Sequence, residues 1–191
     1  MTKRVFMVHR WGGQPDDIWF PWLQKELKQK GFQIFAPLMP DTDHPIIENW
    51  VPALAQAVGT PDEQTYFVGH SMGCETIARY LETLPEGQKV GGVVFVAGYF
   101  KRLTLESKEE YLIADPWLKT PLDLQNVASH LSKSVAIFSD DDPYVPLDNQ
   151  DDFRDVLKSE VIVMRAMGHF SKSSGITELP IALEKVLELA K

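Results

Sequence analysis

The chain has 191 residues, of which 44% are hydrophobic and 24% are charged. This length and composition are enough to bury a sizeable core, and we expect one domain that spans residues 1–191. The net charge of −8 disfavours a nucleic acid or an anionic membrane as a partner, because both reward clustered lysine and arginine side chains.

Six short runs of β-branched and aromatic residues predict strands. They occupy residues 5–8, 33–36, 65–68, 93–97, 134–138 and 161–164. Because these runs are apolar without alternation, we expect each strand to be buried on both faces, as in a parallel sheet covered by helices.

Apolar residues at helical spacing lie between the strands. Residues 18–30 and 46–58 each predict a helix, the second ending at Gly59. A closing helix starts near Leu179 and carries its proline in the first turn, where proline is tolerated. The interval 98–133 predicts a small cap and one helix. The alternation of strand and helix therefore indicates an α/β fold with helices on both faces of a parallel sheet.

The motif GHSMG, residues 69–73, stands between a predicted strand and a predicted helix. A nucleophile on such a sharp turn has a strained backbone, so the residues two before and two after it must be nearly free of side chain. Gly69 and Gly73 meet this need and make Ser71 the candidate nucleophile. The N–H of Met72 would then donate to a developing oxyanion. The alternative is a glycine-rich turn with an incidental serine.

A serine needs a general base, and five histidines compete for that role. His169 follows the last predicted strand, at the carboxyl edge where open α/β sheets bind ligands, and is the first candidate. His44, in a loop bounded by prolines, is the second. Of the remaining three, His130 precedes a predicted strand and so lies at the wrong edge of the sheet, His9 is expected to have a backbone role, and His70 is expected to serve in packing or support.

The acid is sought in SDDDPYVP, residues 139–146, which follows a predicted strand between the nucleophile and the base. Pro143 restricts the preceding residue to an extended conformation, so Asp142 has the least freedom to turn into solvent. Asp142 is therefore the first candidate. Asp141 and then Asp140 are the alternatives, and those not used are expected to be hydrated turn residues.

These motifs together resemble the small α/β serine hydrolases of the retinoblastoma-binding protein 9 type. The likeness extends over nearly the whole chain in the order WFPWLQKEL, GFQ, MPD, NWVP, GHSMG, RYLE, DDPYVP and MGHF. The resemblance implies Ser71 as nucleophile, Asp142 as acid and His169 as base. It also implies a reduced α/β-hydrolase fold with six parallel strands in the order 2-1-3-4-5-6.

The chain departs from this family pattern in two places. The loop MVHRWGG has Arg10 where many hydrolases have glycine. We expect the Trp11 amide to be the second oxyanion donor, since Gly12 and Gly13 let the loop bend; Arg10 is the alternative donor, or blocks the site. The Leu-x-Cys-x-Glu motif for binding retinoblastoma-type pockets is missing, so that partner is not expected.

The expected activity is serine hydrolysis of small, mostly apolar acyl esters or amides through an acyl-enzyme. We expect the pocket to be aromatic, lined by Tyr99, Trp117, Tyr144 and Phe170. Neither a metal nor a cofactor is expected. Two alternatives stay open: lyase or perhydrolase chemistry with the same triad, and a weakly active or inactive protein that binds a protein partner of unknown kind.

Cys74 is the only cysteine, which excludes an intrachain disulfide and any multi-cysteine metal site. We expect it to be buried packing and not a reactive thiol. No run in the sequence approaches the length of a membrane span, and no targeting signal is found. A cytoplasmic location is therefore expected.

Overall fold

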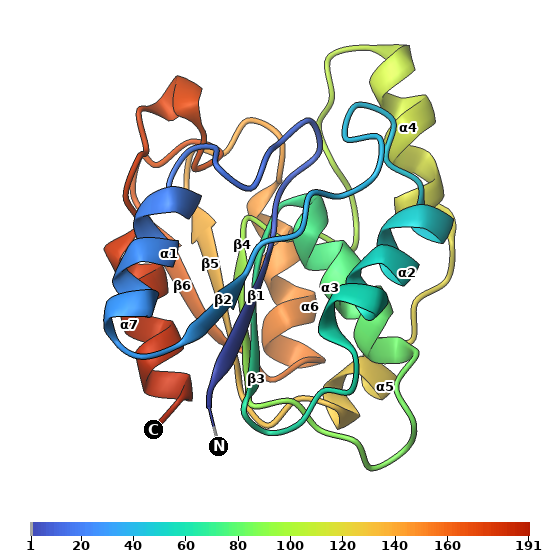
Figure 1. Ribbon diagram of the computed structural model, residues 1–191. Helices are drawn as coiled ribbons and strands as arrows, with labels where there is room; N and C mark the ends of the chain where they lie inside the picture. Colours follow the sequence, from blue (N-terminus) through green and yellow to red (C-terminus); the bar gives the residue numbers. More distant parts are fainter. Residues whose placement is uncertain (1) are drawn as a thin grey trace.

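The computed structural model describes residues 2–191, whose six strands form one parallel sheet in the order β2-β1-β3-β4-β5-β6 (Figure 1). The strands are β1 (Arg4–Val8), β2 (Gln33–Phe35), β3 (Thr65–His70), β4 (Gly92–Val96), β5 (Ser134–Ser139) and β6 (Glu160–Met164). The predicted strand order and fold class are confirmed. The order reverses between β1 and β3, where ligands collect in open α/β sheets.

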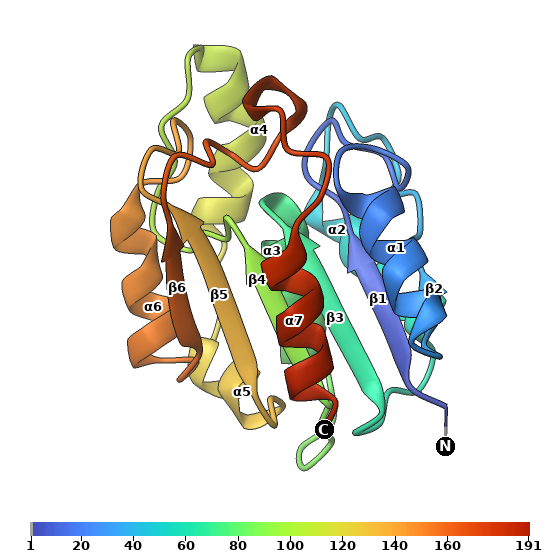
Figure 2. The same cartoon turned by 90° about the vertical axis from the view of Figure 1, so that its left-hand side faces the viewer.

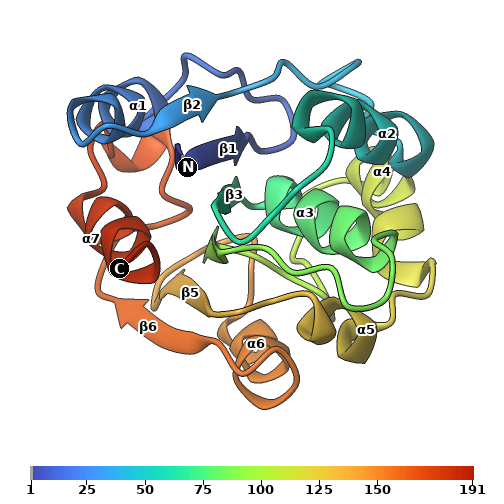
Figure 3. The same ribbon diagram turned by 60° about the horizontal axis from the view of Figure 1, so that its bottom comes forward.

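Helices cover both faces of the sheet (Figures 2 and 3). They are α1 (Phe20–Gln29), α2 (Ile47–Val58), α3 (Met72–Glu82), α4 (Lys108–Lys119), α5 (Leu124–Ser129), α6 (Gln150–Asp155) and α7 (Pro180–Leu189), with 3-10 turns η1 (Leu147–Asn149) and η2 (Lys172–Ser174). One face carries α1 and α7, and the other carries α2, α3, α5 and α6. Within residues 2–191, no helix has the length and apolar character needed to cross a membrane.

Each face of the sheet buries its own hydrophobic core. Along β1, Phe6 and Val8 pack toward α2 and α3, whereas Val5 and Met7 pack toward α1 and α7. The alternation follows from the period of two residues in a strand. The central strand β3 is buried at all six positions. This central strand therefore gives the residue that follows it, Ser71, a rigid support.

Burial on both faces is wrong for the two edge strands. Along β2, Phe35 is 41% exposed, and along β6, Val163 is 45% exposed. Each edge strand has a neighbouring strand on one side only. The apolar runs in the sequence therefore predicted more burial than the two edge strands have.

The interval after β4 contains α4 and α5. Helix α4 stands at the carboxyl edge of the sheet (Figure 1), and α5 packs against α3. A capping box starts α4, in which Ser107 Oγ accepts from the Glu110 N–H and Glu110 accepts from the Ser107 N–H. Its far end is held by Arg79 of α3, which donates to the carbonyls of Trp117 and Thr120 at 2.8 and 2.9 Å. The cap is thus tied to the helix that begins at Ser71.

Candidate active site

Ser71 occupies the sharp turn between β3 and α3 with φ 53° and ψ −118°. This left-handed conformation is costly for a residue with a side chain, and it persists only where the surroundings enforce it. The Ser71 N–H donates to the Val96 carbonyl at 2.8 Å, and the Cys74 N–H donates to the Ser71 carbonyl at 2.8 Å. The side chain does not cap α3, so its hydroxyl is available to the cavity that it lines.

The two glycines around Ser71 have no room for a side chain. A Cβ at Gly69 would lie 2.8 Å from the Cys74 nitrogen, and a Cβ at Gly73 would lie 2.1 Å from the Val8 carbonyl oxygen. The second contact is with rigid backbone of the neighbouring strand β1. Glycine at both positions is therefore a condition for the strand-to-helix turn, as the motif predicted.

Asp142 and His169 form a buried pair. The His169 Nδ1 lies 2.8 Å from Asp142 Oδ2, and their side chains are 9% and 2% exposed. Asp142 Oδ1 also accepts from the N–H groups of Tyr144 and Val145 at 2.9 and 3.0 Å. An ionised carboxylate only accepts, so Nδ1 carries the proton and Nε2 is left as an acceptor. This is the tautomer that a general base requires.

Two aromatic rings flank His169. The His70 ring lies 5.1 Å away and the Tyr144 ring packs edge-on at 5.2 Å. His70 also donates from Nε2 to the His169 carbonyl at 2.9 Å. Burial lowers the pKa of His70 well below its usual value, so His70 stays neutral and adds no second cation beside the candidate base.

The other histidines lie away from the cavity or act on the backbone. His44 is 72% exposed and faces Asp41 at the surface. His130 is buried at the opposite edge of the sheet and bonds the Gln88 carbonyl at 2.7 Å. His9 accepts the Met39 N–H at Nε2. Of the five histidines, His169 alone lines the cavity with Ser71.

Asp140 and Asp141 are exposed turn residues, as the sequence suggested, and each also binds the backbone of the loop before His169. Asp140 accepts the N–H of Ala166, and Asp141 accepts the N–H of Gly168, each at 2.8 Å. The Ser139 hydroxyl, and next the Gly168 N–H, hold the pKa of Asp141 below its usual value. All three aspartates therefore bind the loop that carries His169, and Asp142 alone of the three contacts its ring.

The loop after β1 has a defined peptide orientation. The Arg10 carbonyl accepts from the Gly13 N–H at 3.0 Å and from His9 Nδ1 at 2.8 Å. Because the peptide is trans, the Trp11 N–H points opposite to this carbonyl. The Arg10 guanidinium folds back to the Trp11 carbonyl and to Asp17, both at 3.0 Å. Arg10 thus stabilises the turn through its side chain.

A cavity of about 230 Å³ opens above Ser71. Its walls are formed by Arg10, Trp11, Gly12, Ser71, Met72, Tyr99, Leu103, Leu105, Glu110, Tyr144 and His169. The structure thus places Tyr99 and Tyr144 in the wall, as expected from the sequence. Leu103, Leu105 and Glu110 were not foreseen, because they belong to the cap and its approach, where no regular pattern predicts orientation.

Trp117 and Phe170 do not line this cavity, which corrects the sequence-based expectation. Trp117 is 1% exposed and donates from its indole to the Pro45 carbonyl at 3.0 Å. Phe170 is fully buried on the face of α1 and α7, where its carbonyl accepts from the Trp19 indole at 3.1 Å. Both are core residues, since packing and not sequence position decides which way an aromatic ring turns.

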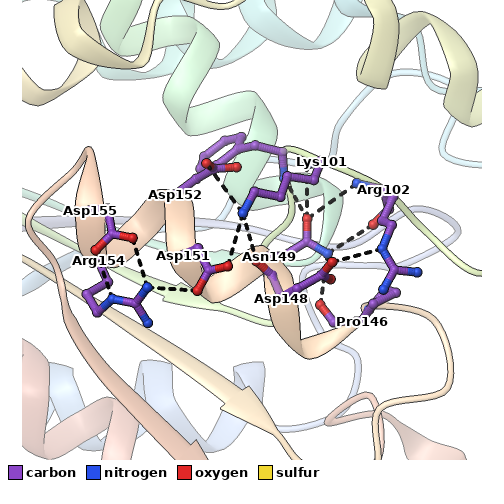
Figure 4. A network of polar contacts seen from close by, with 10 residues as sticks. Lys101, Arg102, Pro146, Asp148, Asn149, Asp151, Asp152, Arg154 and Asp155 are labelled. Atoms are coloured by element: carbon purple, nitrogen blue, oxygen red, sulfur yellow. Dashed lines mark hydrogen bonds and ion pairs between the residues drawn. The ribbon is translucent and has the colours of Figure 1, made fainter.

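A buried asparagine, Asn149, holds the segment of residues 100–102 through a network of polar contacts (Figure 4). The Asn149 side-chain oxygen accepts the N–H groups of residues 100, 101 and 102 at 3.1, 3.0 and 3.5 Å. Its amide nitrogen donates to a carbonyl of the same segment at 3.0 Å and to the Pro146 carbonyl at 2.9 Å. The segment lies between Tyr99 and Leu103 of the wall. No sequence signal pointed to Asn149, because a buried asparagine in an acidic segment looks like any surface amide.

The only cysteine of the chain, Cys74, is not placed to act as a second nucleophile. Cys74 is fully buried, its thiol faces the Val96 carbonyl at 3.4 Å, and burial raises its pKa. Such a thiol is packing and not a nucleophile. Within residues 2–191, no group of three or more histidine, cysteine or acidic side chains is arranged to hold a metal ion.

Comparison with known proteins places this chain among serine hydrolases. The family model described as "Serine hydrolase" matches residues 5–188. "Putative hydrolase YdeN" of Bacillus subtilis is 32% identical over 185 residues, covering 96% of this chain and 94% of the relative. "Serine hydrolase RBBP9" of Rattus norvegicus is 28% identical over 174 residues, covering 90% and 89%.

Solved structures agree in fold. The crystal structure of the ydeN gene product from B. subtilis superposes with a TM-score of 0.90 at 30% identity, covering 98% of both chains. A structure reported with the carboxylesterases of the ammonia-oxidizing thaumarchaeon Nitrososphaera gargenis gives a TM-score of 0.74 at 15% identity, covering 99% of this chain and 91% of the other. The second likeness is one of fold alone.

Proposed function

The chain belongs to the serine hydrolase family, and from that premise we propose that it cleaves small, mostly apolar acyl esters or amides through a Ser71–His169–Asp142 triad. One observation carries the proposal. In the buried His169–Asp142 pair, Nδ1 lies 2.8 Å from the carboxylate, and the His169 ring lines the same cavity as the strained Ser71. Hydroxyl, imidazole and carboxylate have the chain order that acyl transfer needs, and the contact between imidazole and carboxylate supports the assignment.

The first half of the reaction forms an acyl-enzyme. Ser71 Oγ attacks the substrate carbonyl carbon, and its proton passes to His169 Nε2. Asp142 stabilises the imidazolium through its bond to Nδ1. As the tetrahedral intermediate collapses, the bond to the leaving alcohol or amine breaks, and that group takes the proton from Nε2. In the second half, His169 takes a proton from water, which attacks the carbonyl carbon of the acyl-enzyme. The bond to Ser71 Oγ then breaks, Ser71 recovers its proton from His169, and the carboxylic acid is released.

Two backbone N–H groups are proposed to hold the oxyanion. The Met72 N–H starts α3, where helix N–H groups have no partner within the helix. The Trp11 N–H points away from the carbonyl that His9 and Gly13 hold, and Trp11 lines the cavity. The Arg10 side chain folds back onto the Trp11 carbonyl and Asp17, so it supports the loop that carries this N–H.

The cavity favours small acyl groups. Its volume of about 230 Å³ lies below the range of about 300–1,000 Å³ that is common for drug-sized ligands. Leu103, Leu105 and the rings of Tyr99 and Tyr144 provide apolar contact. We therefore expect activity toward p-nitrophenyl acetate and butyrate and a decline with longer acyl chains.

A fluorophosphonate probe tests the proposal, read by intact mass. We expect one adduct for each chain at neutral pH, lost in Ser71→Ala and strongly slowed in His169→Ala. Ser132→Ala, an exposed hydroxyl at the far edge of the sheet, is the matched control and should label as the wild type does. No adduct on the folded wild type would refute the proposal and favour a binding protein without turnover.

A further inference from the structure

The loop that carries His169 has an unusual backbone. Ala166, Gly168 and Phe170 have φ values of 55°, 52° and 49°. Two of these residues carry side chains, for which the left-handed region is unfavourable. Alternating left-handed residues do not continue a strand or a helix, so something outside the loop must hold this conformation.

Side chains from the turn after β5 hold it. The backbone N–H groups of residues 166–168 all donate to side-chain oxygens of residues 139–141. The distances are 2.8 Å to Asp140, 2.9 Å to Ser139 and 2.8 Å to Asp141. Three successive N–H groups are thus satisfied by two carboxylates and one hydroxyl of the same turn, which holds the backbone of residues 166–168 in its unfavourable conformation.

The turn and the loop are matched residue by residue at their last two positions. Asp141 binds the N–H of Gly168, and the next residue, Asp142, binds the ring of the next residue, His169. Ser139 also donates to Asp141 at 2.6 Å, which fixes the direction of that carboxylate. The contact between acid and base therefore follows directly from a neighbouring contact between side chain and backbone.

We propose that Asp141 is a positioning residue for His169, holding the 166–168 backbone so that the imidazole meets Asp142 and faces Ser71. The inference rests on the proposed triad. Asp141 does not touch the reacting atoms, and its carboxylate acts through Gly168. On the far side of the loop, a Cβ at Gly168 would lie 2.2 Å from Ser174 Oγ, so the loop is confined between Asp141 and η2.

Asp141 is better placed for this role than its neighbours. Asp140 accepts the N–H of Ala166, which lies three positions before His169. Asp141 accepts the N–H of Gly168, which lies directly before it. The hydrogen bonds that hold the pKa of Asp141 below its usual value also keep it ionised at neutral pH. At neutral pH the carboxylate therefore accepts from both Ser139 and Gly168.

Three variants and two readouts test the proposal. Asp141→Ala removes the acceptor, and Asp141→Asn keeps an acceptor oxygen in the same place. Asp155→Ala removes an equal charge at an exposed residue that pairs with Arg154 and is the control. The kinetic readout is kcat and KM for p-nitrophenyl butyrate. The structural readout is the NMR signal of the hydrogen-bonded His169 Nδ1 proton, assigned by its loss in His169→Ala.

We expect Asp141→Ala to lower kcat by about tenfold to a hundredfold with KM within about threefold of the wild type. Its Nδ1 proton signal should broaden or vanish. Asp141→Asn should keep the signal and most of the rate, and Asp155→Ala should match the wild type. If thermal unfolding shows that Asp141→Ala does not fold, Asp141→Ser takes its place. The serine side chain is too short to reach the Gly168 N–H, so we expect the same loss of kcat and of the Nδ1 proton signal.

A wild-type kcat together with a sharp Nδ1 proton signal in Asp141→Ala would overturn the inference. The NMR readout needs no turnover, so it keeps the test separate from that of the proposed function. If the wild type neither labels with the probe nor turns over ester, the hydrolase proposal fails. The effect of Asp141 on the His169–Asp142 contact is still decided by the Nδ1 signal.

Discussion

Replacing Asp142 with asparagine should reverse the tautomer of His169. The amide has nearly the shape of the carboxylate, and its oxygen still accepts from the N–H groups of Tyr144 and Val145. Its nitrogen then faces His169 Nδ1 and donates to it. The ring proton must move to Nε2, which no longer accepts a proton from Ser71.

The size of the effect follows from these contacts. A wrong tautomer in a serine triad lowers kcat by about 10⁴-fold, which corresponds to about 5.5 kcal/mol of transition-state stabilisation. Stability should change far less, because two of the three hydrogen bonds that Asp142 accepts are kept. Exchanging one charge-assisted bond for a neutral one costs about 1 kcal/mol.

The assay measures hydrolysis of p-nitrophenyl butyrate and urea unfolding of the same preparations. Asp155→Asn, with the same loss of charge at an exposed residue, is the control and should keep the wild-type rate. If folded Asp142→Asn kept more than about a tenth of the wild-type kcat, the tautomer argument would be wrong, since its effect is about 10⁴-fold. A large loss of stability would instead show that the pair is chiefly structural.

Gly73→Ala should prevent folding or lower the melting temperature strongly, because the new Cβ would lie 2.1 Å from the Val8 carbonyl oxygen. Gly87→Asn, at φ +81° with open space around it, should cost little, and equal melting temperatures for the two variants would contradict the steric argument. Glu75→Gln should change how stability depends on pH. Burial raises the pKa of Glu75 from 4.5 to about 8, against the opposing effect of Arg79. Between these values the folded protein binds more protons than the unfolded chain, so the free energy of unfolding should fall as pH rises. Glu75→Gln should make the free energy of unfolding, measured with urea, fall less steeply between about pH 5 and pH 8 than in the wild type. If the wild type and the variant showed the same slope of this free energy against pH, the prediction would be wrong.

Short-range patterns account for the correct part of the sequence-based prediction. Strand and helix positions depend on local periodicity, and the elbow depends on two glycines whose spacing reports a steric need near Ser71. The observed helices α1 and α2 begin within two residues of the predicted ranges and end within one. The strand order also came from the family resemblance, and the structure confirms it.

Errors arose where orientation depends on distant neighbours. Trp117 and Phe170 were expected in the pocket, but both rings lie in the core. The Trp117 indole donates to the Pro45 carbonyl, and the Phe170 backbone carbonyl accepts from the Trp19 indole, so both contacts reach far along the chain. Asn149 gave no signal, because its role lies in backbone groups of residues 100–102. Such contacts are not encoded in any window of neighbouring residues.

The three aspartates at residues 140–142 show most clearly what the sequence determined and what only the tertiary structure decided. The sequence alone determined that an acid follows β5, and the proline that follows it singled out Asp142 through a local backbone restriction. Only the tertiary structure decided that Asp140 and Asp141 bind the strained loop before His169. A carboxylate on a turn can be satisfied by water or by backbone N–H groups, and the choice depends on whether the sheet brings another loop within reach.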